Sequence, residues 1–202
     1  MNKCLIVGRP NVGKTAFLLS FAKYCGLKEL EIRVKTSDGT TISKRRSIDA
    51  AYSELVQPTS HTTQELQSVL LDLPFGKGQK TLELVDSSGL IDGIHPSPAI
   101  RRAMARTLEA IALAQIIIHI LDAALIGLKG TGEGIGAIDW DLAEYAKQNR
   151  EYLLLANKMD LSGANQGLAL IRKSFTGVRV YPVSAKTMQG FKEVRRHVLR
   201  AC

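Results

Sequence analysis

Short apolar runs alternate with segments of helical periodicity along the chain. The apolar runs predict strands at residues 3–8, 80–86, 115–123, 151–158 and 178–184. Several of these runs are apolar nearly throughout, as strands covered on both faces should be. Helical patterns lie at residues 14–24, 98–113, 138–149, 164–175 and 188–199. This alternation is typical of parallel strands joined by crossover helices, so the chain is predicted to be an α/β protein.

A sixth strand is expected at residues 68–73, where it would pair antiparallel with residues 80–86 across the turn-rich PFGKGQ. The prediction is therefore a six-stranded, mostly parallel sheet with helices on both faces. Ser97 followed by Pro98 is a good cap and first residue for the second helix.

Composition narrows the class of protein. A chain of 202 residues is the size of one domain, or at most two small ones, and no apolar run approaches the roughly 20 residues of a membrane span. Nothing resembles a signal peptide, so we expect a cytoplasmic protein. The cysteines Cys4, Cys25 and Cys202 lack metal-ligand spacing, and we interpret Cys4 and Cys25 as core residues. The net charge of +8 permits an anionic partner without requiring one.

The stretch GRPNVGKT, residues 8–15, is the first motif that indicates a ligand. It fits the pattern G-x-x-x-x-G-K-[ST] and lies between a predicted strand and a predicted helix, the context that makes the pattern a phosphate-binding loop. Gly8 and Gly13 let backbone N–H groups turn toward a polyphosphate, and the helix adds its positive end. Lys14 would reach the β- and γ-phosphates, and the Thr15 hydroxyl would hold Mg²⁺.

Two later motifs indicate which base is bound. In NKMD, residues 157–160, the Asp160 carboxylate can accept two hydrogen bonds from N1–H and a 2-amino group, an edge that guanine has and adenine lacks. In VSAK, residues 183–186, backbone N–H groups could donate to the guanine O6, while the stems of Lys158 and Lys186 flank the base. Each motif alone is weak, because its residues are common in loops. In order, each after a strand, they predict a guanine site.

With these motifs the chain resembles the P-loop GTPases, and within them the Era- and TrmE-like branch of the translation-factor-related class. DSSGL, residues 86–90, resembles the D-x-x-G motif of that branch, and HTTQEL resembles its G-T-T-R-D. The resemblance covers nearly the whole chain and implies a three-layer G domain that binds GTP or GDP. The implied nucleotide-binding residues are Gly8, Asn11, Val12, Gly13, Lys14, Thr15, Ala16, Asn157, Lys158, Asp160, Ser184, Ala185 and Lys186.

The resemblance also implies a switch mechanism. Thr15, Thr63 and Asp86 would hold Mg²⁺, Asp86 through water, and the Gly89 N–H would sense the γ-phosphate. Thr63 is preferred over Thr62, with Thr59 third. Lys14, Thr63, Gly89 and Asn11 are the implied catalytic residues.

Leu90 stands where Ras-like proteins carry a glutamine that positions the attacking water, so hydrolysis here is slow or relies on another device. Members of the branch with an asparagine at the position of Asn11 use a bound K⁺. We therefore hypothesise K⁺-stimulated hydrolysis, with a simple turn residue as the alternative for Asn11.

Three departures from the branch stand out. Lys14 and Thr63 are farther apart in sequence than expected. This indicates an insertion at about residues 28–58, before switch I, the segment that contains Thr63, in a single domain spanning 1–202. The insertion reads as a hairpin turning at Asp38-Gly39, followed by a short helix capped by Ser47. It is either an effector-facing element or a decorated loop. Ser87-Ser88 replaces Thr-Ala, and the glycine-rich residues 129–136 read as a flexible connection.

Other polar residues have structural interpretations. His119, inside an apolar run, is interpreted as a satisfied core histidine, and no motif requires His61 or His95. The basic residues of two helices are interpreted as solvent-exposed helix faces, and the alternative is that they contact a nucleic-acid backbone. They are Arg101, Arg102 and Arg106, and Lys192, Arg195, Arg196 and Arg200.

Two functions remain open once GTP binding is granted. The first is a GTPase switch in ribosome assembly or another RNA process, which the charge and the resemblance favour. The second is a regulatory GTPase with little intrinsic turnover that controls a protein or membrane-complex partner. Nucleotide-dependent dimerisation, a mode of some relatives, is a further possibility, as is a binding module without turnover.

Overall fold

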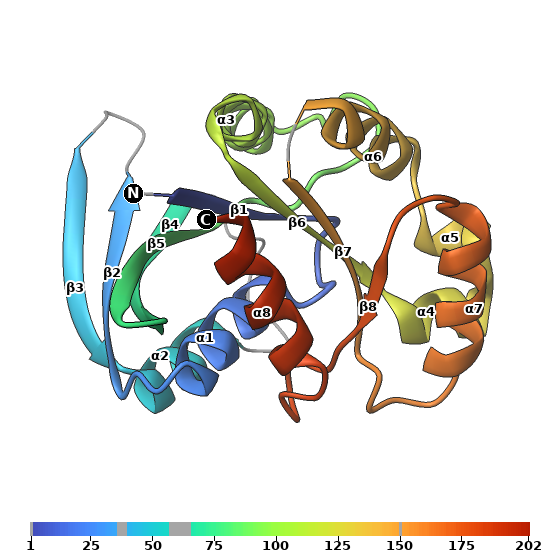
Figure 1. Cartoon of the computed structure of the whole chain (residues 1–202). Coiled ribbons are helices and arrows are strands. Elements are labelled where there is room, and N and C mark those ends of the chain that lie inside the picture. The colour runs from blue at the N-terminus through green and yellow to red at the C-terminus, as the bar shows by residue number, and fades with distance from the viewer. Residues whose placement is uncertain (1, 36–39, 57–65, 150) are drawn as a thin grey trace.

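The computed structural model describes residues 2–35, 40–56, 66–149 and 151–202, and these form one eight-stranded sheet with helices on both faces (Figure 1). The strand order is β3-β2-β4-β5-β1-β6-β7-β8. From β5 to β8 the strands are parallel, and from β3 to β5 they are antiparallel. The strands are β1 Asn2–Val7, β2 Glu29–Lys35, β3 Thr41–Ser47, β4 Leu66–Phe75, β5 Gly78–Asp86, β6 Ile116–Asp122, β7 Glu151–Asn157 and β8 Val180–Pro182.

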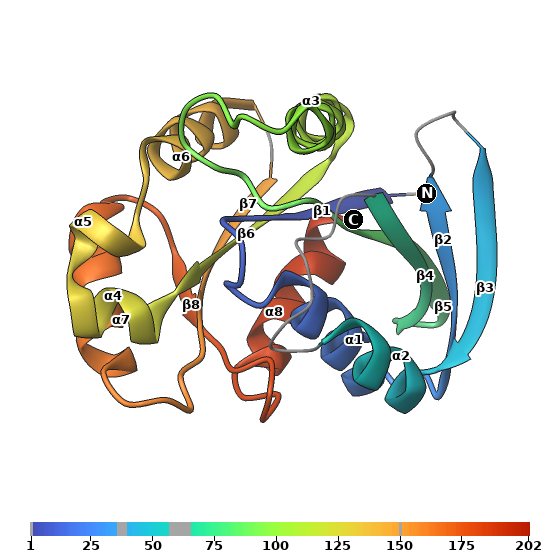
Figure 2. The same cartoon turned by 180° about the vertical axis from the view of Figure 1, so that it is seen from behind.

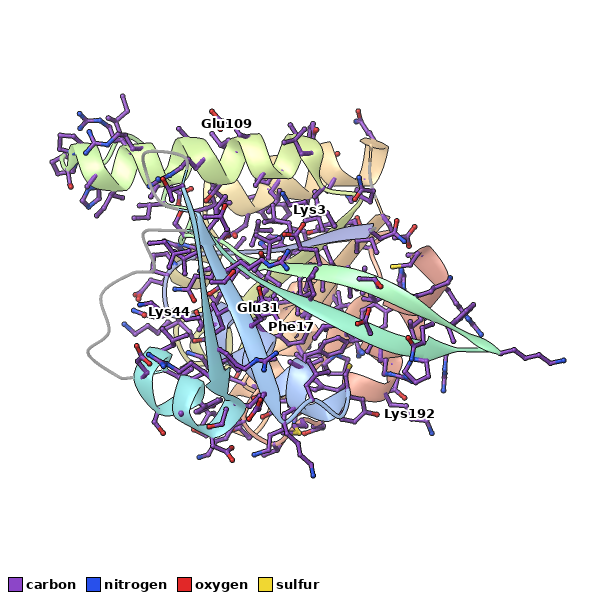
Figure 3. All side chains as sticks on the ribbon, turned by 90° about the vertical axis from the view of Figure 1, so that its left-hand side faces the viewer. Lys3, Phe17, Glu31, Lys44, Glu109 and Lys192 are labelled. Atoms are coloured by element: carbon purple, nitrogen blue, oxygen red, sulfur yellow. The ribbon has the colours of Figure 1, made fainter. Side chains whose placement is uncertain are left out.

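The prediction of six strands was wrong, because the segment before switch I adds two more. β2 and β3 form the predicted hairpin, and β2 also pairs antiparallel with β4 at Ile32 and Val69. The hairpin therefore extends the main sheet, and in Figure 3 it lies on the side facing the viewer. Local sequence indicates a hairpin, but which strand pairs with β2 on the side away from β3 depends on residues far away in the chain. Its turn, Asp38-Gly39, lies outside the described residues.

The helices fall into three groups. α1 (Lys14–Tyr24), α2 (Ile48–Leu55) and α8 (Phe191–Ala201) cover one face, and α3 (Pro98–Leu113) and α6 (Ala137–Asn149) cover the other, as Figure 2 shows from behind. α4 (Ala123–Lys129), α5 (Thr131–Gly134) and α7 (Ala164–Ser174) lie beyond β7 and β8. Ser47 caps α2 as predicted, its hydroxyl accepting from the Ala50 N–H at 3.3 Å.

Successive side chains along β1 point to opposite faces of the sheet and contribute to the core on both faces. Cys4 and Ile6 join the apolar cluster under α1 and α8, while Leu5 and Val7 join the cluster under α3 and α6. All four side chains are fully buried, which explains why the run is apolar throughout. On the first face, Phe191 packs edge-on against Phe17 with ring centroids 5.2 Å apart and so ties α8 to α1.

Two helix predictions need correction. The last helix begins at Phe191 rather than at Met188, because Met188 (φ 62°) and Gly190 (φ 77°) adopt left-handed backbone that a right-handed helix cannot contain. Residues 129–136, predicted as a flexible connection, contain α5, which follows the unpredicted helix α4. Among the described residues, no helix combines the length and apolar character needed to span a bilayer.

Candidate nucleotide-binding site

Four of the motifs named above, GRPNVGKT, DSSGL, NKMD and VSAK, meet at one edge of the sheet. The phosphate loop follows β1, Asp86 ends β5, Asn157 ends β7, and Ser184 comes just after β8. These strands are mutually parallel, so their carboxyl ends share an edge, the usual ligand-binding position in such sheets.

The phosphate loop requires glycine at two positions. Gly8 has φ 146°, and a Cβ there would lie 2.4 Å from the Ile120 carbonyl oxygen. Gly13 has φ 98°, and its Cβ would lie 2.5 Å from the Asn157 side-chain amide. Gly13 is also the N-cap of α1 and provides no side-chain cap, so the first N–H groups of this helix are left for an anionic ligand.

Lys14 lies across the phosphate loop. Its side chain is buried, and its Nζ donates to the carbonyl oxygens of Gly8 at 3.1 Å and Arg9 at 2.9 Å. Burial lowers the pKa of Lys14 to about 8, although the nearby Asp86 carboxylate opposes this shift. A bound phosphate would favour the charged form and raise this pKa again.

Asp86, which is buried, and Thr15, which is half-buried, form a pair that fits a magnesium ion. The Thr15 hydroxyl donates to Asp86 Oδ2 at 2.5 Å, and Asp86 is only 1% exposed. Its other oxygen, Oδ1, is buried without a hydrogen-bond partner among the described residues. A buried carboxylate oxygen without a donor suits a hard cation, and Mg²⁺ is commonly held by few protein ligands together with substrate phosphates. Burial raises the pKa of Asp86 to about 6, with Lys14 and Thr15 opposing it.

The residues after Asp86 anchor the start of the segment that follows β5. The Ser87 hydroxyl donates to the Ile6 carbonyl oxygen at 2.7 Å, and the Ser88 hydroxyl donates to that of Ala103 at 3.1 Å. Leu90 is buried in the apolar cluster under α3 and α6, and its N–H donates to the Gly8 carbonyl oxygen at 3.1 Å. Ser87 and Ser88 thus join this segment to β1 and α3, a role that the sequence analysis missed.

Gly89 fits tightly against the phosphate loop. A Cβ at this position would lie 2.7 Å from the Pro10 side chain and 2.8 Å from its backbone nitrogen. Only glycine allows this approach without a shift of one segment.

Asn157 joins the two halves of the site. It is 1% exposed, its Nδ2 donates to the Val12 carbonyl oxygen at 2.8 Å, and its Oδ1 accepts from the Ala185 N–H at 3.0 Å. The phosphate loop and the VSAK loop are therefore held to each other through one side-chain amide. This bridge was not predicted, because neither partner is near Asn157 in sequence.

The predicted base-binding residues are held by specific partners. Asp160 Oδ1 accepts from the Ser184 hydroxyl at 2.6 Å. Lys158 has a left-handed backbone (φ 65°), and its Nζ lies 2.5 Å from Asp122 Oδ2. Asp122 ends β6, directly opposite Asn157, and was missed by the sequence analysis. An acidic residue at the end of the neighbouring parallel strand was the available signal. Lys186 is exposed at the surface.

Other expected site residues have different outcomes. Thr63, Thr62, Thr59 and His61 lie outside the described residues. Asn11 is exposed at the loop with φ 63°.

His95 and His119 each have a hydrogen-bond partner within the protein. His95 Nδ1 accepts from the Ser97 N–H at 3.1 Å. The interpretation of His119 as a satisfied core residue is confirmed, since it is fully buried between the Tyr152 hydroxyl at 2.7 Å and Asp139 at 2.9 Å.

Comparison with known families agrees with this geometry. Residues 3–158 match the family model described as 50S ribosome-binding GTPase. A GTPase Obg of Heliobacterium modesticaldum is 32% identical over 198 residues, which is 96% of this chain and 37% of that protein. The tRNA modification GTPase MnmE of Symbiobacterium thermophilum is 28% identical over 200 residues, 98% of this chain and 34% of that protein. The chain thus spans little more than a third of these relatives.

Solved structures show the same fold. The crystal structure of Era in complex with MgGDPNP and nucleotides 1506-1542 of 16S ribosomal RNA superimposes with a TM-score of 0.66 at 19% identity, covering 99% of this chain and 56% of that one. The G domain of the T. maritima FeoB iron transporter gives a TM-score of 0.58 at 19% identity, covering 100% and 98%.

Proposed function

The chain belongs to the 50S ribosome-binding GTPase family, and on that premise we propose that it binds GTP and GDP with Mg²⁺, hydrolyses GTP and acts as a nucleotide-dependent switch. The observation that carries the proposal is the Asn157 bridge, which joins a phosphate loop to a base loop in one site. The single G domain spans residues 1–202, with the insertion at about 28–58.

In the phosphate half, the backbone N–H groups of the loop and of the first turn of α1 bind the β-phosphate, and Lys14 binds the β- and γ-phosphates. The two positions of the loop that require glycine and the uncapped start of α1 support this assignment. The remaining contacts come from Asn11, Val12, Thr15 and Ala16 of the same loop.

In the base half, Asp160 accepts hydrogen bonds from N1–H and the 2-amino group of guanine. Its hydrogen bond from Ser184 supports this role, because it fixes the carboxylate next to the VSAK loop. The Ala185 N–H is already used by Asn157, so we assign the guanine O6 contact to the backbone of Lys186. The stem of Lys158, anchored at Asp122, flanks the base.

Thr15, Asp86 and Thr63 would hold Mg²⁺. The buried Asp86 oxygen without a donor supports this assignment. When bound, the ion neutralises charge on the β- and γ-phosphates. The Gly89 N–H reports the presence of the γ-phosphate.

Hydrolysis requires a charge-stabilising device other than a glutamine, because Leu90 is packed into the core. We assign that role to K⁺ bound beside Asn11, whose exposed side chain at the phosphate loop supports the assignment.

The chain acts in ribosome assembly or another RNA process in the cytoplasm. The family description, the tRNA-linked MnmE relative and the charge of +8 support this placement. A regulatory GTPase with little turnover of its own, controlling a protein partner, is the second candidate, and nucleotide-dependent dimerisation would be one route to its activation. The buried Leu90 favours it, since the residue after Gly89 cannot position water.

The test is GTP hydrolysis by the purified chain with Mg²⁺, in KCl and in NaCl at matched ionic strength, beside titrations with GDP and ADP. We expect GDP to bind, ADP not to bind, and hydrolysis to be faster in KCl. GDP binding without turnover in either salt would favour the second candidate. Failure to bind GDP would refute the proposal.

A further inference from the structure

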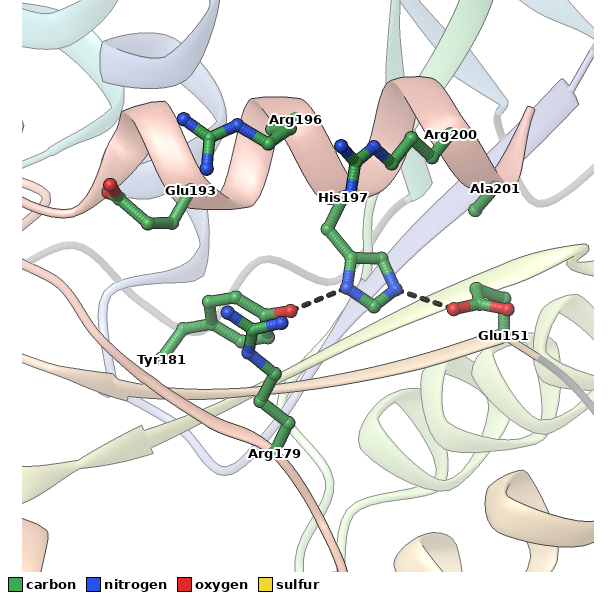
Figure 4. Close-up of a pocket in the computed structure, with 8 residues that line it drawn as sticks. All are labelled: Glu151, Arg179, Tyr181, Glu193, Arg196, His197, Arg200 and Ala201. Carbon is green, nitrogen blue, oxygen red and sulfur yellow. Dashed lines mark hydrogen bonds and ion pairs between the residues drawn. The ribbon is translucent and has the colours of Figure 1, made fainter.

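A second polar pocket lies at the opposite end of β7 from the nucleotide loops (Figure 4). β7 begins at Glu151, which lines this pocket, and ends at Asn157 in the nucleotide site, about 20 Å away at 3.3 Å per residue. The pocket has a volume of about 380 Å³, within the range of small-ligand sites. Its lining includes Glu151, Arg179, Tyr181, Arg196, His197 and Arg200.

Basic side chains dominate this pocket. One face of α8 carries Arg196, His197 and Arg200, because Arg200 lies four residues after Arg196 and three after His197. This face is opposite the buried Val194 and Val198. Arg179 reaches the same pocket from the segment before β8. Its guanidinium carbon lies 5.0 Å from the centre of the Tyr181 ring, a stacking contact that orients the planar fork.

His197 lines the pocket and is held by two hydrogen bonds. Its Nδ1 shares a hydrogen bond of 2.5 Å with the Tyr181 hydroxyl, and its Nε2 shares one of 2.5 Å with Glu151 Oε1. These contacts tie α8 to β8 and to the start of β7, so the position of the helix face is set by the fold. They also direct the Glu151 carboxylate toward the imidazole.

The three arginines remain available to a ligand. Each is exposed, and within the described part of the chain none of the three takes part in an ion pair. Guanidinium groups bind phosphate through paired N–H···O contacts, which are stronger than neutral hydrogen bonds. Glu193 lines the same pocket, and its negative charge opposes a bare anion.

We propose that this pocket is a second anion site that binds a phosphate group through Arg179, Arg196 and Arg200. The inference goes beyond the proposed GTPase activity and involves none of the residues of the nucleotide site. The phosphate can belong to the backbone of an RNA strand or to a free phosphate compound, since the arginines recognise the same oxygens in both. Lys192, on the same helix but outside the pocket, has no part in it.

The test uses the full chain saturated with GDP and Mg²⁺, so that the phosphate loop is occupied. Inorganic phosphate is titrated by calorimetry, and a short fluorescein-labelled single-stranded RNA by anisotropy, against wild type and three variants. Arg196→Ala/Arg200→Ala removes two cations of the pocket, Glu193→Gln removes the opposing charge, and Lys192→Ala is the control. All four substituted positions are exposed, so the variants should fold.

We expect at least one probe to bind the wild type, and the double arginine variant to bind it about tenfold or more weakly. Glu193→Gln should bind it more tightly and Lys192→Ala as wild type does. If RNA is the ligand, the double variant should also reduce the salt slope by about 1.4, or 0.7 for each lost contact. Tight binding of free phosphate alone would identify the other source.

Two results would overturn the inference. One is that neither probe binds the wild type at near-physiological salt. The other is that Lys192→Ala weakens binding as much as the double variant does, which would indicate general attraction to a basic surface. GDP binding is measured on the same samples, so a failure of the proposed nucleotide function is recognised separately.

Discussion

Asp86 should destabilise the nucleotide-free chain at neutral pH, and Asp86→Asn should relieve this. The carboxylate is 1% exposed, and one of its oxygens has no donor among the described residues. Its pKa rises from an ordinary value of 3.8 to about 6, because burial penalises the charged form more than Lys14, Thr15 and the Ser87 backbone favour it. Asparagine keeps the shape and an oxygen that can accept from Thr15, without the charge.

The magnitude follows from the pKa. At about 1.4 kcal/mol per pH unit, ionising Asp86 in the folded chain costs about 3 kcal/mol more than in the unfolded chain. Between pH 4 and pH 6 the folded chain holds a proton that the unfolded chain has released, so the free energy of unfolding falls as the pH rises through this window. Above pH 6 the full penalty applies.

The assay is urea or thermal unfolding in EDTA without nucleotide, from pH 4 to pH 8. Above pH 6, Asp86→Asn should be more stable than wild type by up to about 3 kcal/mol, or roughly 6–12 °C in Tm for a chain of this size. The difference should shrink toward zero near pH 4. Asp141→Asn, at an exposed position on α6, is the matched control and should show no such pH dependence.

The same unfolding measurement with GDP and Mg²⁺ present is a second test. With GDP and Mg²⁺, wild type should gain more stability than Asp86→Asn, because only wild type retains the carboxylate proposed to hold the metal. A variant that is no more stable than wild type at pH 7.5 without ligand would refute the reasoning. So would a stabilisation that persists unchanged at pH 4.

Three further predictions concern the site and the packing around it. Asn157→Ala should lower the free energy of unfolding, measured by urea denaturation, by about 2–3 kcal/mol and should weaken GDP binding by about tenfold or more. The reason is that two buried backbone groups, the Val12 carbonyl and the Ala185 N–H, lose their partner. Unchanged GDP affinity would contradict the bridging role. Asp160→Asn should weaken GDP binding by about a hundredfold and should favour xanthosine diphosphate over GDP in competition binding, since an amide can donate to the 2-oxo group of xanthine. A retained preference for GDP would exclude the carboxylate contact. Gly127→Ala should lower the free energy of unfolding by about 1–3 kcal/mol, because its Cβ would lie 1.9 Å from the Gly163 carbonyl oxygen. Gly132→Ala, with nothing within 4 Å of the added Cβ, is the control, and equal Tm values for both would refute the packing argument.

Much of the site was accessible from sequence because its parts are local. The phosphate loop, the end of β5 and the NKMD and VSAK stretches each consist of a few consecutive residues after an apolar strand. Parallel strands bring their carboxyl ends to one edge, so the order of the motifs implied their proximity. The Ser47 cap of α2 was predictable for the same reason, since its partner lies three residues away.

The chain sequence by itself determined the class of fold, the phosphate loop and the guanine motifs, because these follow from local periodicity and short spacing. Only the tertiary structure decided that the hairpin joins the main sheet, that Asn157 bridges Val12 and Ala185, and that Arg179 meets Arg196 and Arg200 in one pocket. Each of these contacts joins residues that are distant in the chain, and the packing of helices on the sheet determines which of them come together.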